Sequence, residues 1–247
     1  MAKKPTATSD ARPLKNAPLD IQALLAKESE GIASKIAAPS GDRIKFNKNG
    51  TITCPDGSEG TEIEVVVLDF VSNNLFYDRP YDKDVVLPPA CFAIGPEPTL
   101  LIPSKNSPNR IADTCSACPN NQFGSALNGK GKACKNSRLV AVSPADAKEG
   151  DCPIWILSIP PTSIKSFDAY VSGLAIKNKT IPVGVVTSLT LDPNSEYASP
   201  RFSVVRPLSA EELPLFFETR AGALARLTTE PDVSGYEAPK AARGRGR

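Results

Sequence analysis

Six cysteines in a chain without histidine constrain the fold of this protein more than any other feature of its sequence. Cys115 and Cys118 form a Cys-x2-Cys pair, and Cys134 follows after fifteen residues. This spacing is typical of the ligands in a zinc ribbon. Cys134 has no partner cysteine two residues further on. A fourth zinc ligand must therefore come from a more distant part of the chain.

We expect Cys91 to be this fourth ligand, because Cys91 and Cys134 bracket the Cys-x2-Cys pair and could be pinned at one point. Four thiolates give Zn2+ a tetrahedral shell without an open position, so the ion would be structural. Cys152 and Cys54 are the alternative ligands, and are otherwise expected to be buried thiols. The Cys-x2-Cys pair could also be a redox pair, although Pro119 follows it rather than a helix start.

The segment that carries the cysteines is basic. Residues 104–138 contain six bases and one acid, Asp113. Two bases are enough to balance the double negative charge of a Zn(Cys)4 centre, and we expect the surplus to bind phosphate. The six candidate phosphate ligands are Lys105, Arg110, Lys130, Lys132, Lys135 and Arg138.

Three aromatic residues are candidate stacking platforms for nucleic-acid bases, a contact worth about 1–3 kcal/mol per base. Tyr77 and Tyr81 lie in a polar stretch and are expected to be exposed. Phe123 lies within the cysteine segment, where its alternative role is a hydrophobic plug for the zinc loop.

The apolar pattern predicts a mainly β fold with minor helix, and 24 prolines argue against a helical bundle. Residues 63–71 are apolar on both faces, as in a central strand. Residues 160–174 carry one apolar stripe typical of a helix. Five strands with a helix between the third and fourth predict an OB-fold-like five-stranded barrel, with an inserted zinc-binding loop and flanking helices. The other predicted strands are 44–46, 51–53, 75–77, 85–87, 138–142, 154–159, 183–191 and 202–205.

Composition divides the chain into a body with two polar ends. Ser209 and Glu212 form a capping box for a last helix. The final nine residues hold four bases and no acid, and could add affinity for any polyanion. The predicted parts are a flexible arm (1–43) that could hold a short helix, an OB-like domain (44–207) with its zinc insertion (89–137), a docked helix (208–229) and a disordered basic tail (230–247).

Several classes of protein are excluded by what the sequence lacks. It has no apolar run of eighteen residues and no secretory signal, so we expect a cytoplasmic protein without a membrane span. It has no histidine, no phosphate-binding P-loop and no nucleophile elbow. We therefore expect neither catalysis nor a small-molecule substrate.

The segment 115–125, Cys-Ser-Ala-Cys-Pro-Asn-Asn-Gln-Phe-Gly-Ser, together with 129–135, Gly-Lys-Gly-Lys-Ala-Cys-Lys, resembles a family of bacteriophage and prophage proteins. These are zinc-containing single-stranded DNA-binding proteins of DNA replication and recombination. The resemblance implies an OB-like fold with a zinc loop, a single strand bound beside the metal, and replication or recombination proteins as partners. Members commonly end in an acidic tail and often use a histidine ligand, whereas this chain has a basic tail and no histidine.

Two other functions fit the same sequence. A zinc-ribbon module could dock on a polymerase, or serve as a phage accessory or structural protein, without binding nucleic acid directly. Alternatively, the basic ends alone could bind duplex DNA or RNA. For single-strand binding, the pattern of basic and aromatic residues is compatible with RNA as well as with DNA.

Overall fold

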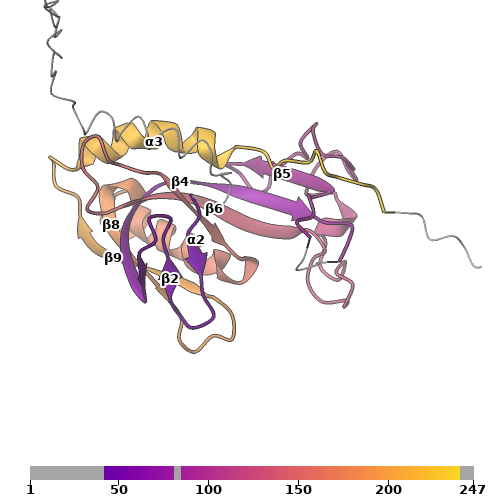
Figure 1. The fold of residues 1–247 in the computed structure, drawn as a ribbon, viewed down its shortest axis with the longest axis horizontal. Coiled ribbons are helices and arrows are strands. Elements are labelled where there is room, and N and C mark those ends of the chain that lie inside the picture. Colours follow the sequence, from indigo (N-terminus) through magenta and orange to yellow (C-terminus); the bar gives the residue numbers. More distant parts are fainter. Residues whose placement is uncertain (1–41, 81–84, 240–247) are drawn as a thin grey trace, which may run out of the picture. The chain divides into compact units, whose positions relative to one another are not determined.

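The computed structural model describes residues 42–80 and 85–239. Residues 1–41, 81–84 and 240–247 lie outside the described residues, and with them most of the predicted arm and the end of the predicted tail. In the described part the fold is mainly β with two α-helices, which confirms the predicted class (Figure 1).

Short turns and one long connection join the elements of this fold. The strands are β1 (Lys45–Phe46), β2 (Ile52–Thr53), β3 (Glu59–Gly60), β4 (Glu62–Phe76), β5 (Cys91–Gly95), β6 (Lys135–Pro144), β7 (Trp155–Ile159), β8 (Val185–Leu191) and β9 (Pro200–Pro207), and the α-helices are α2 (Ile164–Gly173) and α3 (Leu213–Leu227).

Strand β4 is the centre of a six-stranded antiparallel sheet with the order β7-β6-β4-β8-β9, in which β5 also pairs with β4. One edge of β4 pairs with β6. The other edge is divided, because β8 pairs with Glu62–Val65 and β5 with Ser72–Phe76. Leu68 is an extra residue in the β4–β6 register, and such a bulge bends and twists a strand. One long, bulged strand thus serves three partners.

The predicted five-stranded barrel is wrong, because this sheet is not closed. Among the described residues, the outer strands β7 and β9 do not pair with each other. In chain order α2 follows β4, β5, β6 and β7, so the helix lies between the fourth and fifth of the six strands of this sheet, whereas the predicted order placed it between the third and fourth. Strand β5 is additional to that order.

Two predicted strands differ in the structure. Residues 75–77 do not start a new strand, because β4 runs through Asn73 and Asn74. The amide nitrogen of Asn73 donates to Ser137 at 3.2 Å, and that of Asn136 donates to Asn74 at 2.7 Å, so these polar side chains are satisfied inside the sheet. Residues 85–87 form no strand, and the strand that pairs with the end of β4 is β5.

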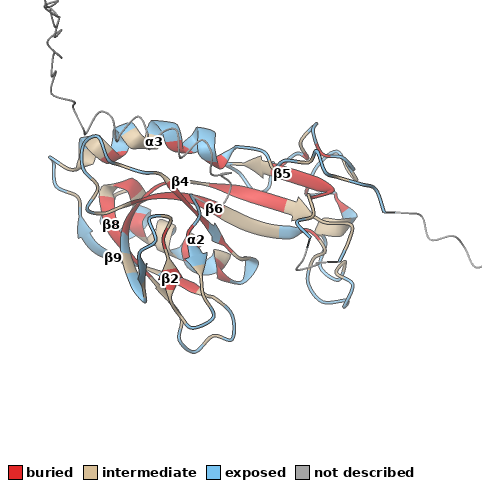
Figure 2. Cartoon of the chain, viewed as in Figure 1, coloured by how far each residue is buried: buried red, intermediate tan, exposed pale blue. Residues whose placement is uncertain are grey.

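Apolar side chains cover both faces of the sheet. On one face Val65, Val67 and Val140 pack with Phe167 of α2. On the other face Val66, Leu68 and Ala141 pack with α3 through Phe216 and Leu227. Burial on both faces explains the continuous apolar run of β4. Figure 2 shows the central strands largely in red, while the loops beyond the end of β4 are pale blue and tan.

The predicted hairpin at 44–53 is confirmed. Strands β1 and β2 are antiparallel, with Phe46 opposite Ile52, and β3 adds a third strand. The turn between β1 and β2 contains Gly50 at φ 85°, a conformation that glycine adopts without steric cost. Ile52 is fully buried against the sheet.

No helix within 42–80 and 85–239 has the length and apolar character of a membrane span.

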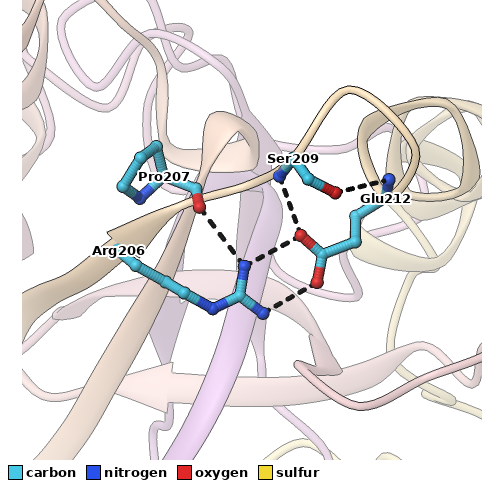
Figure 3. A network of polar contacts seen from close by, with 4 residues as sticks. All are labelled: Arg206, Pro207, Ser209 and Glu212. Atoms are coloured by element: carbon cyan, nitrogen blue, oxygen red, sulfur yellow. Dashed lines mark hydrogen bonds and ion pairs between the residues drawn. The ribbon is translucent and has the colours of Figure 1, made fainter.

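The predicted capping box joins β9 to α3 (Figure 3). The Glu212 carboxylate accepts a backbone hydrogen bond from Ser209 at 2.8 Å, and the Glu212 N–H donates to the Ser209 hydroxyl at 3.2 Å. The Arg206 guanidinium donates to both carboxylate oxygens, at 2.7 and 2.8 Å. These hydrogen bonds, Arg206 first and then the Ser209 N–H, lower the pKa of Glu212 from 4.5 to about 2.

The depressed pKa of Glu212 predicts a pH-dependent contribution to stability. The contribution is complete above pH 4.5, where the Glu212 carboxyl is ionised in both the folded and the unfolded state. It is lost as the pH falls towards about 2, because the unfolded chain takes up the proton at a higher pH than the folded one. We expect Glu212→Gln to lower the free energy of unfolding at neutral pH and to differ little from wild type near pH 2, measured by urea denaturation. Glu211→Gln, at the exposed neighbour, is the control. A deficit of the same size at both pH values would contradict this assignment.

Candidate metal centre and nucleic-acid groove

The four cysteines predicted as metal ligands line one small pocket. Cys91 begins β5, Cys134 directly precedes β6, and Cys115 and Cys118 lie in the long connection between these strands. All four are buried. The pocket has a volume of about 20 Å³, which is room for little more than one water molecule or small ion. We call this set of four residues the cysteine cluster.

Strand pairing and two backbone hydrogen bonds bring the cluster together. The end of β4 lies between β5 and β6, so the two strands place Cys91 and Cys134 on either side of it. The N–H of Cys134 donates to the carbonyl of Asn120 at 2.8 Å, and the N–H of Cys115 donates to that of Leu101 at 2.9 Å. The two ends of the connection are thus held at one point, as the sequence spacing suggested.

Burial favours the protonated thiol at Cys91, Cys115 and Cys134. Burial is the largest cause of the raised pKa of Cys91, Cys115 and Cys134, and the pKa of Cys134 rises to about 12. The charges of the other cluster cysteines contribute to the rise at Cys134, whereas Lys132 acts in the opposite direction. Several thiolates in one pocket therefore require a cation to be stable.

The cysteine cluster is not a finished ligand set. Within the described ranges, no three Cys, Asp or Glu side chains are arranged so that they could hold a metal ion. The four thiols surround a common pocket, but a tetrahedral site requires side-chain rotation to bring the sulfurs about 2.3 Å from one ion. Neither Cys54 nor Cys152 lines the pocket: Cys54 lies in the core, and Cys152 is 3.2 Å from the Ser143 hydroxyl.

A larger groove, which we call the strand groove, lies on the other side of the same strand ends. Successive side chains of a strand face opposite ways. Asn74 and Phe76 line the cysteine pocket, whereas Asn73, Leu75 and Tyr77 line the strand groove. The groove has a volume of about 710 Å³. It is lined by Arg43, Asn73, Leu75, Tyr77, Arg79, Val85, Val86, Leu87, Ala133, Lys135, Ser137, Leu139, Ser158, Pro160 and Pro161.

The strand groove is basic and largely apolar. Its charged lining residues are Arg43, Arg79 and Lys135, and none of the described residues that line it is acidic. The ammonium of Lys135 lies 5.5 Å from the centre of the Tyr77 ring, a cation–π distance. Burial raises the pKa of Tyr77, and the nearby charge of Arg43 acts in the opposite direction. The remaining lining is mainly Leu, Val and Pro with a few Ser and Asn side chains.

The structure separates the candidate nucleic-acid ligands into groups. Tyr77 and Lys135 lie in the strand groove. Lys132 and Phe123 meet in the connection, where the Lys132 ammonium is 5.3 Å from the Phe123 ring centre, and Phe123 is 84% exposed. Its exposure argues against a role as a plug for the loop. Three further bases, Lys105, Arg110 and Lys130, are exposed elsewhere in the connection, and Tyr81 lies outside the described residues.

Arg138 has structural partners. Its guanidinium forms an ion pair with Asp168 of α2 at 3.2 Å and donates a hydrogen bond to the hydroxyl of Ser72 on β4. The Arg138 side chain is only 12% exposed. These contacts tie α2 to the sheet and leave little of the guanidinium for a phosphate.

Sequence reasoning missed two bases of the strand groove, Arg43 and Arg79. Arg79 is two residues from Tyr77, in the polar stretch that the sequence analysis had selected only for its tyrosines. Arg43 precedes β1 and reaches the groove because Ile44 bonds to the backbone of Ile156 on β7, at 3.0 Å. No local sequence signal indicates that long-range contact.

Comparison of the chain with protein-family models, with curated proteins and with solved structures finds no match. The chemistry of the two sites is therefore inferred from their own side chains.

The ion pair of Arg138 predicts a loss of stability rather than of ligand contacts. We expect Arg138→Gln to lower the free energy of unfolding by about 1–2 kcal/mol, because it removes charge-assisted bonds to Ser72 and to a partly exposed Asp168. Arg201→Gln breaks the more exposed pair with Asp192 and should cost clearly less stability than Arg138→Gln in the same urea titration. Unchanged stability in Arg138→Gln would show that its guanidinium is free for other contacts.

Proposed function

We propose that this chain is a non-enzymatic protein that binds single-stranded nucleic acid, primarily DNA, in the strand groove. The observation that carries the proposal is the combination of an apolar floor, the Tyr77 ring and three bases, Arg43, Arg79 and Lys135, in one groove where none of the described lining residues is acidic. Single-strand binders pair such a positive groove with aromatic platforms on which bases stack.

The character of the floor favours an unpaired strand over a duplex. Leu75, Leu139 and Pro160 offer apolar surface to the faces of nucleobases, while the arginine and lysine side chains of the groove can bind phosphates. In a duplex the base faces are stacked and inaccessible, so only the charged residues would find partners. The groove volume of about 710 Å³ also lies within the range of sites that enclose a ligand.

The strand order supports an OB-like description of the domain, as an open sheet rather than a closed barrel. The path β4-β6-β7 corresponds to the first three strands of an OB-fold, α2 follows, and β8 returns to pair with β4. OB-folds bind oligonucleotides over their second and third strands. Here Lys135, Ser137 and Leu139 of β6 and Ser158 of β7 line the groove on that face.

We further propose that Zn2+ binds the cysteine cluster and is structural. Four cysteines from two strand ends and a Cys-x2-Cys pair supply the donors of a closed tetrahedral site. The connection has little apolar core of its own, since its buried cluster consists of Ala93, Leu101 and Cys115. The bound ion would therefore stabilise the connection and fix the ends of β5 and β6. A closed thiolate shell has no position for a reacting water.

The resemblance to phage single-stranded DNA-binding proteins supports the same proposal and extends it. It suggests a phage-encoded protein that protects or presents single strands in replication or recombination in the host cytoplasm. A protein-interaction module is the second candidate. It is favoured by the exposed apolar side chains of the connection, Phe123 and the fully exposed Leu127.

Substitutions in the strand groove test the main proposal. We expect Tyr77→Ala to weaken binding of a single-stranded DNA by about 1–3 kcal/mol through loss of one stacked base, and Tyr77→Phe to retain most of the affinity. Lys135→Gln should reduce the slope of log affinity against log salt by about 0.7. Fluorescence anisotropy with labelled DNA, RNA and duplex of equal length measures both effects.

Lys177→Gln is the matched control for Lys135→Gln, because Lys177 is exposed and does not line the groove. The proposal would be wrong if duplex DNA bound as tightly as the single strand. It would also be wrong if both Tyr77→Ala and Lys135→Gln bound with wild-type affinity. Wild-type affinity in these variants, combined with capture of a protein partner through Phe123 and Leu127, would favour the interaction module.

Removal of single cysteines tests the metal. We expect about one Zn2+ per chain by native mass spectrometry, and loss of the ion when Cys91, Cys115, Cys118 or Cys134 is replaced by Ala. The controls Cys54→Ala and Cys152→Ala should retain the ion, because neither residue lines the pocket. A wild-type protein prepared with zinc that carries no metal would refute the site.

Metal removal should also loosen the connection before the sheet. A chelator is expected to speed trypsin cleavage after Lys105, Arg110, Lys130 and Lys132, because the backbone of the connection depends on the ion more than on apolar burial to stay folded. The sheet, with buried side chains on both faces, should resist. Cleavage that is no faster without metal would show that the connection holds its shape unaided.

A further inference from the structure

An asparagine of β4 is buried against the cysteine cluster. Asn74 lines the same pocket as the four cysteines, and it is only 6% exposed. A buried side-chain amide costs free energy unless both its oxygen and its nitrogen find hydrogen-bond partners. The partners of Asn74 therefore indicate what kind of group the pocket is built to stabilise.

The oxygen of the Asn74 amide is bound by the neighbouring strand. It accepts a hydrogen bond from the side-chain amide of Asn136 on β6 at 2.7 Å. Asn74 and Asn136 also lie directly opposite each other in the register of β4 and β6. This bond fixes the orientation of the Asn74 amide, because the oxygen is used towards β6 and the NH2 group is left to donate to another partner.

The NH2 group of Asn74 donates to the sulfur of Cys115. Burial is the main cause of the raised pKa of the Cys115 thiol, and the hydrogen bond from the Asn74 side chain acts in the opposite direction. The sulfur of a neutral thiol is a weak hydrogen-bond acceptor, whereas hydrogen bonds to an ionised acceptor are about twice as strong. An amide donor buried against this sulfur thus matches a thiolate better than a thiol.

A second sulfur of the cysteine cluster also has hydrogen-bond donors. Burial raises the pKa of the Cys91 thiol, and hydrogen bonds from the Ser107 hydroxyl and from the backbone of Ile111 oppose that rise. Ser107 is itself buried, and its hydroxyl oxygen accepts a hydrogen bond from the N–H of Phe92 at 3.0 Å. Donors from β4 and from the connection therefore meet two different sulfurs of one cluster.

We propose that Asn74, oriented by Asn136, is a positioning residue of the metal centre, whose N–H···S hydrogen bond stabilises the Cys115 thiolate and thereby increases the affinity of the cluster for Zn2+. This inference rests on the proposed metal site and deepens it. Four thiolates around Zn2+ leave a double negative charge, and hydrogen-bond donors around the ligands stabilise that charge and hold the ligands in place.

The substitution Asn74→Leu tests the donor, because leucine has a similar volume but cannot donate a hydrogen bond. We expect its affinity for Zn2+ to be about 10–100-fold lower than that of the wild type, measured in competition with a chromophoric chelator. Asn73→Leu is the matched control and should bind Zn2+ with wild-type affinity. Asn73 precedes Asn74 on β4 and also bonds to β6, through Ser137 at 3.2 Å, but it lines the strand groove.

Cobalt supplies a measurement that a loss of sheet stability alone would not change. Co2+ held by thiolates absorbs light through charge transfer from sulfur to the metal, and a hydrogen bond to the sulfur lowers the energy of the electrons that are transferred. We therefore expect this absorption band to lie at longer wavelength in Asn74→Leu than in the wild type. Asn73→Leu should retain the wild-type band.

The variant Asn136→Ala tests the orientation of the amide while Asn74 itself is unchanged. Loss of the bond that holds the Asn74 oxygen should weaken Zn2+ binding, although less than Asn74→Leu does. It should add nothing when Asn74 is already Leu, because the two residues act through one hydrogen-bond chain. If Asn74→Leu does not fold, as circular dichroism would show, Asn136→Ala and its cobalt spectrum still decide the question.

The outcomes separate this inference from the proposed metal site. Wild-type affinity and an unshifted cobalt band in Asn74→Leu would overturn the role of Asn74, while the loss of Zn2+ in Cys115→Ala would still support the site. A loss in Asn73→Leu as large as that in Asn74→Leu would assign the effect to the sheet and not to the sulfur. A wild-type protein that binds no Zn2+ would refute the metal site, and this inference with it.

Discussion

The alternation of side chains along the end of β4 is the constraint on which the rest of the site depends. One strand pairs with β6 on one edge and with β5 on the other, so its last residues are fixed in register. Their side chains must then face two different environments. Asn74 and Phe76 face the cysteine cluster, while Leu75 and Tyr77 face the strand groove. A shift of one residue in register would exchange the two faces and destroy both sites.

This arrangement links the proposed metal to the proposed ligand. Cys134 belongs to the cysteine cluster, and its neighbours Ala133 and Lys135 line the groove. Fixing Cys134 on an ion would therefore also fix the backbone that carries Lys135 against Tyr77. The basic residues divide accordingly between two roles. Lys132 lies close enough to Cys134 to affect its pKa, whereas Lys135 and Arg79 line the groove.

Particular residues show why the sequence predicted some elements and missed others. The apolar run from 63 to 71 was recognisable because burial on both faces leaves no polar alternation. Asn73 and Asn74 lie between two predicted strands, 63–71 and 75–77, because asparagine side chains usually favour turns. In the structure Ser137 and Asn136, more than sixty residues away, satisfy those amides and keep the strand straight through. The prediction of a closed barrel was wrong for a similar reason. Whether the two outer strands meet depends on the twist that accumulates over the whole sheet, which no local pattern records.

The sequence by itself determined the mainly β class, a helix within residues 160–174, the capping box of α3 and the grouping of four cysteines. These follow from local periodicity, spacing and hydrogen-bonding chemistry, which neighbouring residues fix. Only the tertiary structure decided that Arg138 is held in an ion pair and that Arg43 lines the same groove as Tyr77 and Arg79. It also decided that the segment following α3 is bound to the end of the sheet, where the Tyr236 hydroxyl donates to Asp78. Contacts between segments distant in sequence depend on strand pairing and packing, and no local pattern records them.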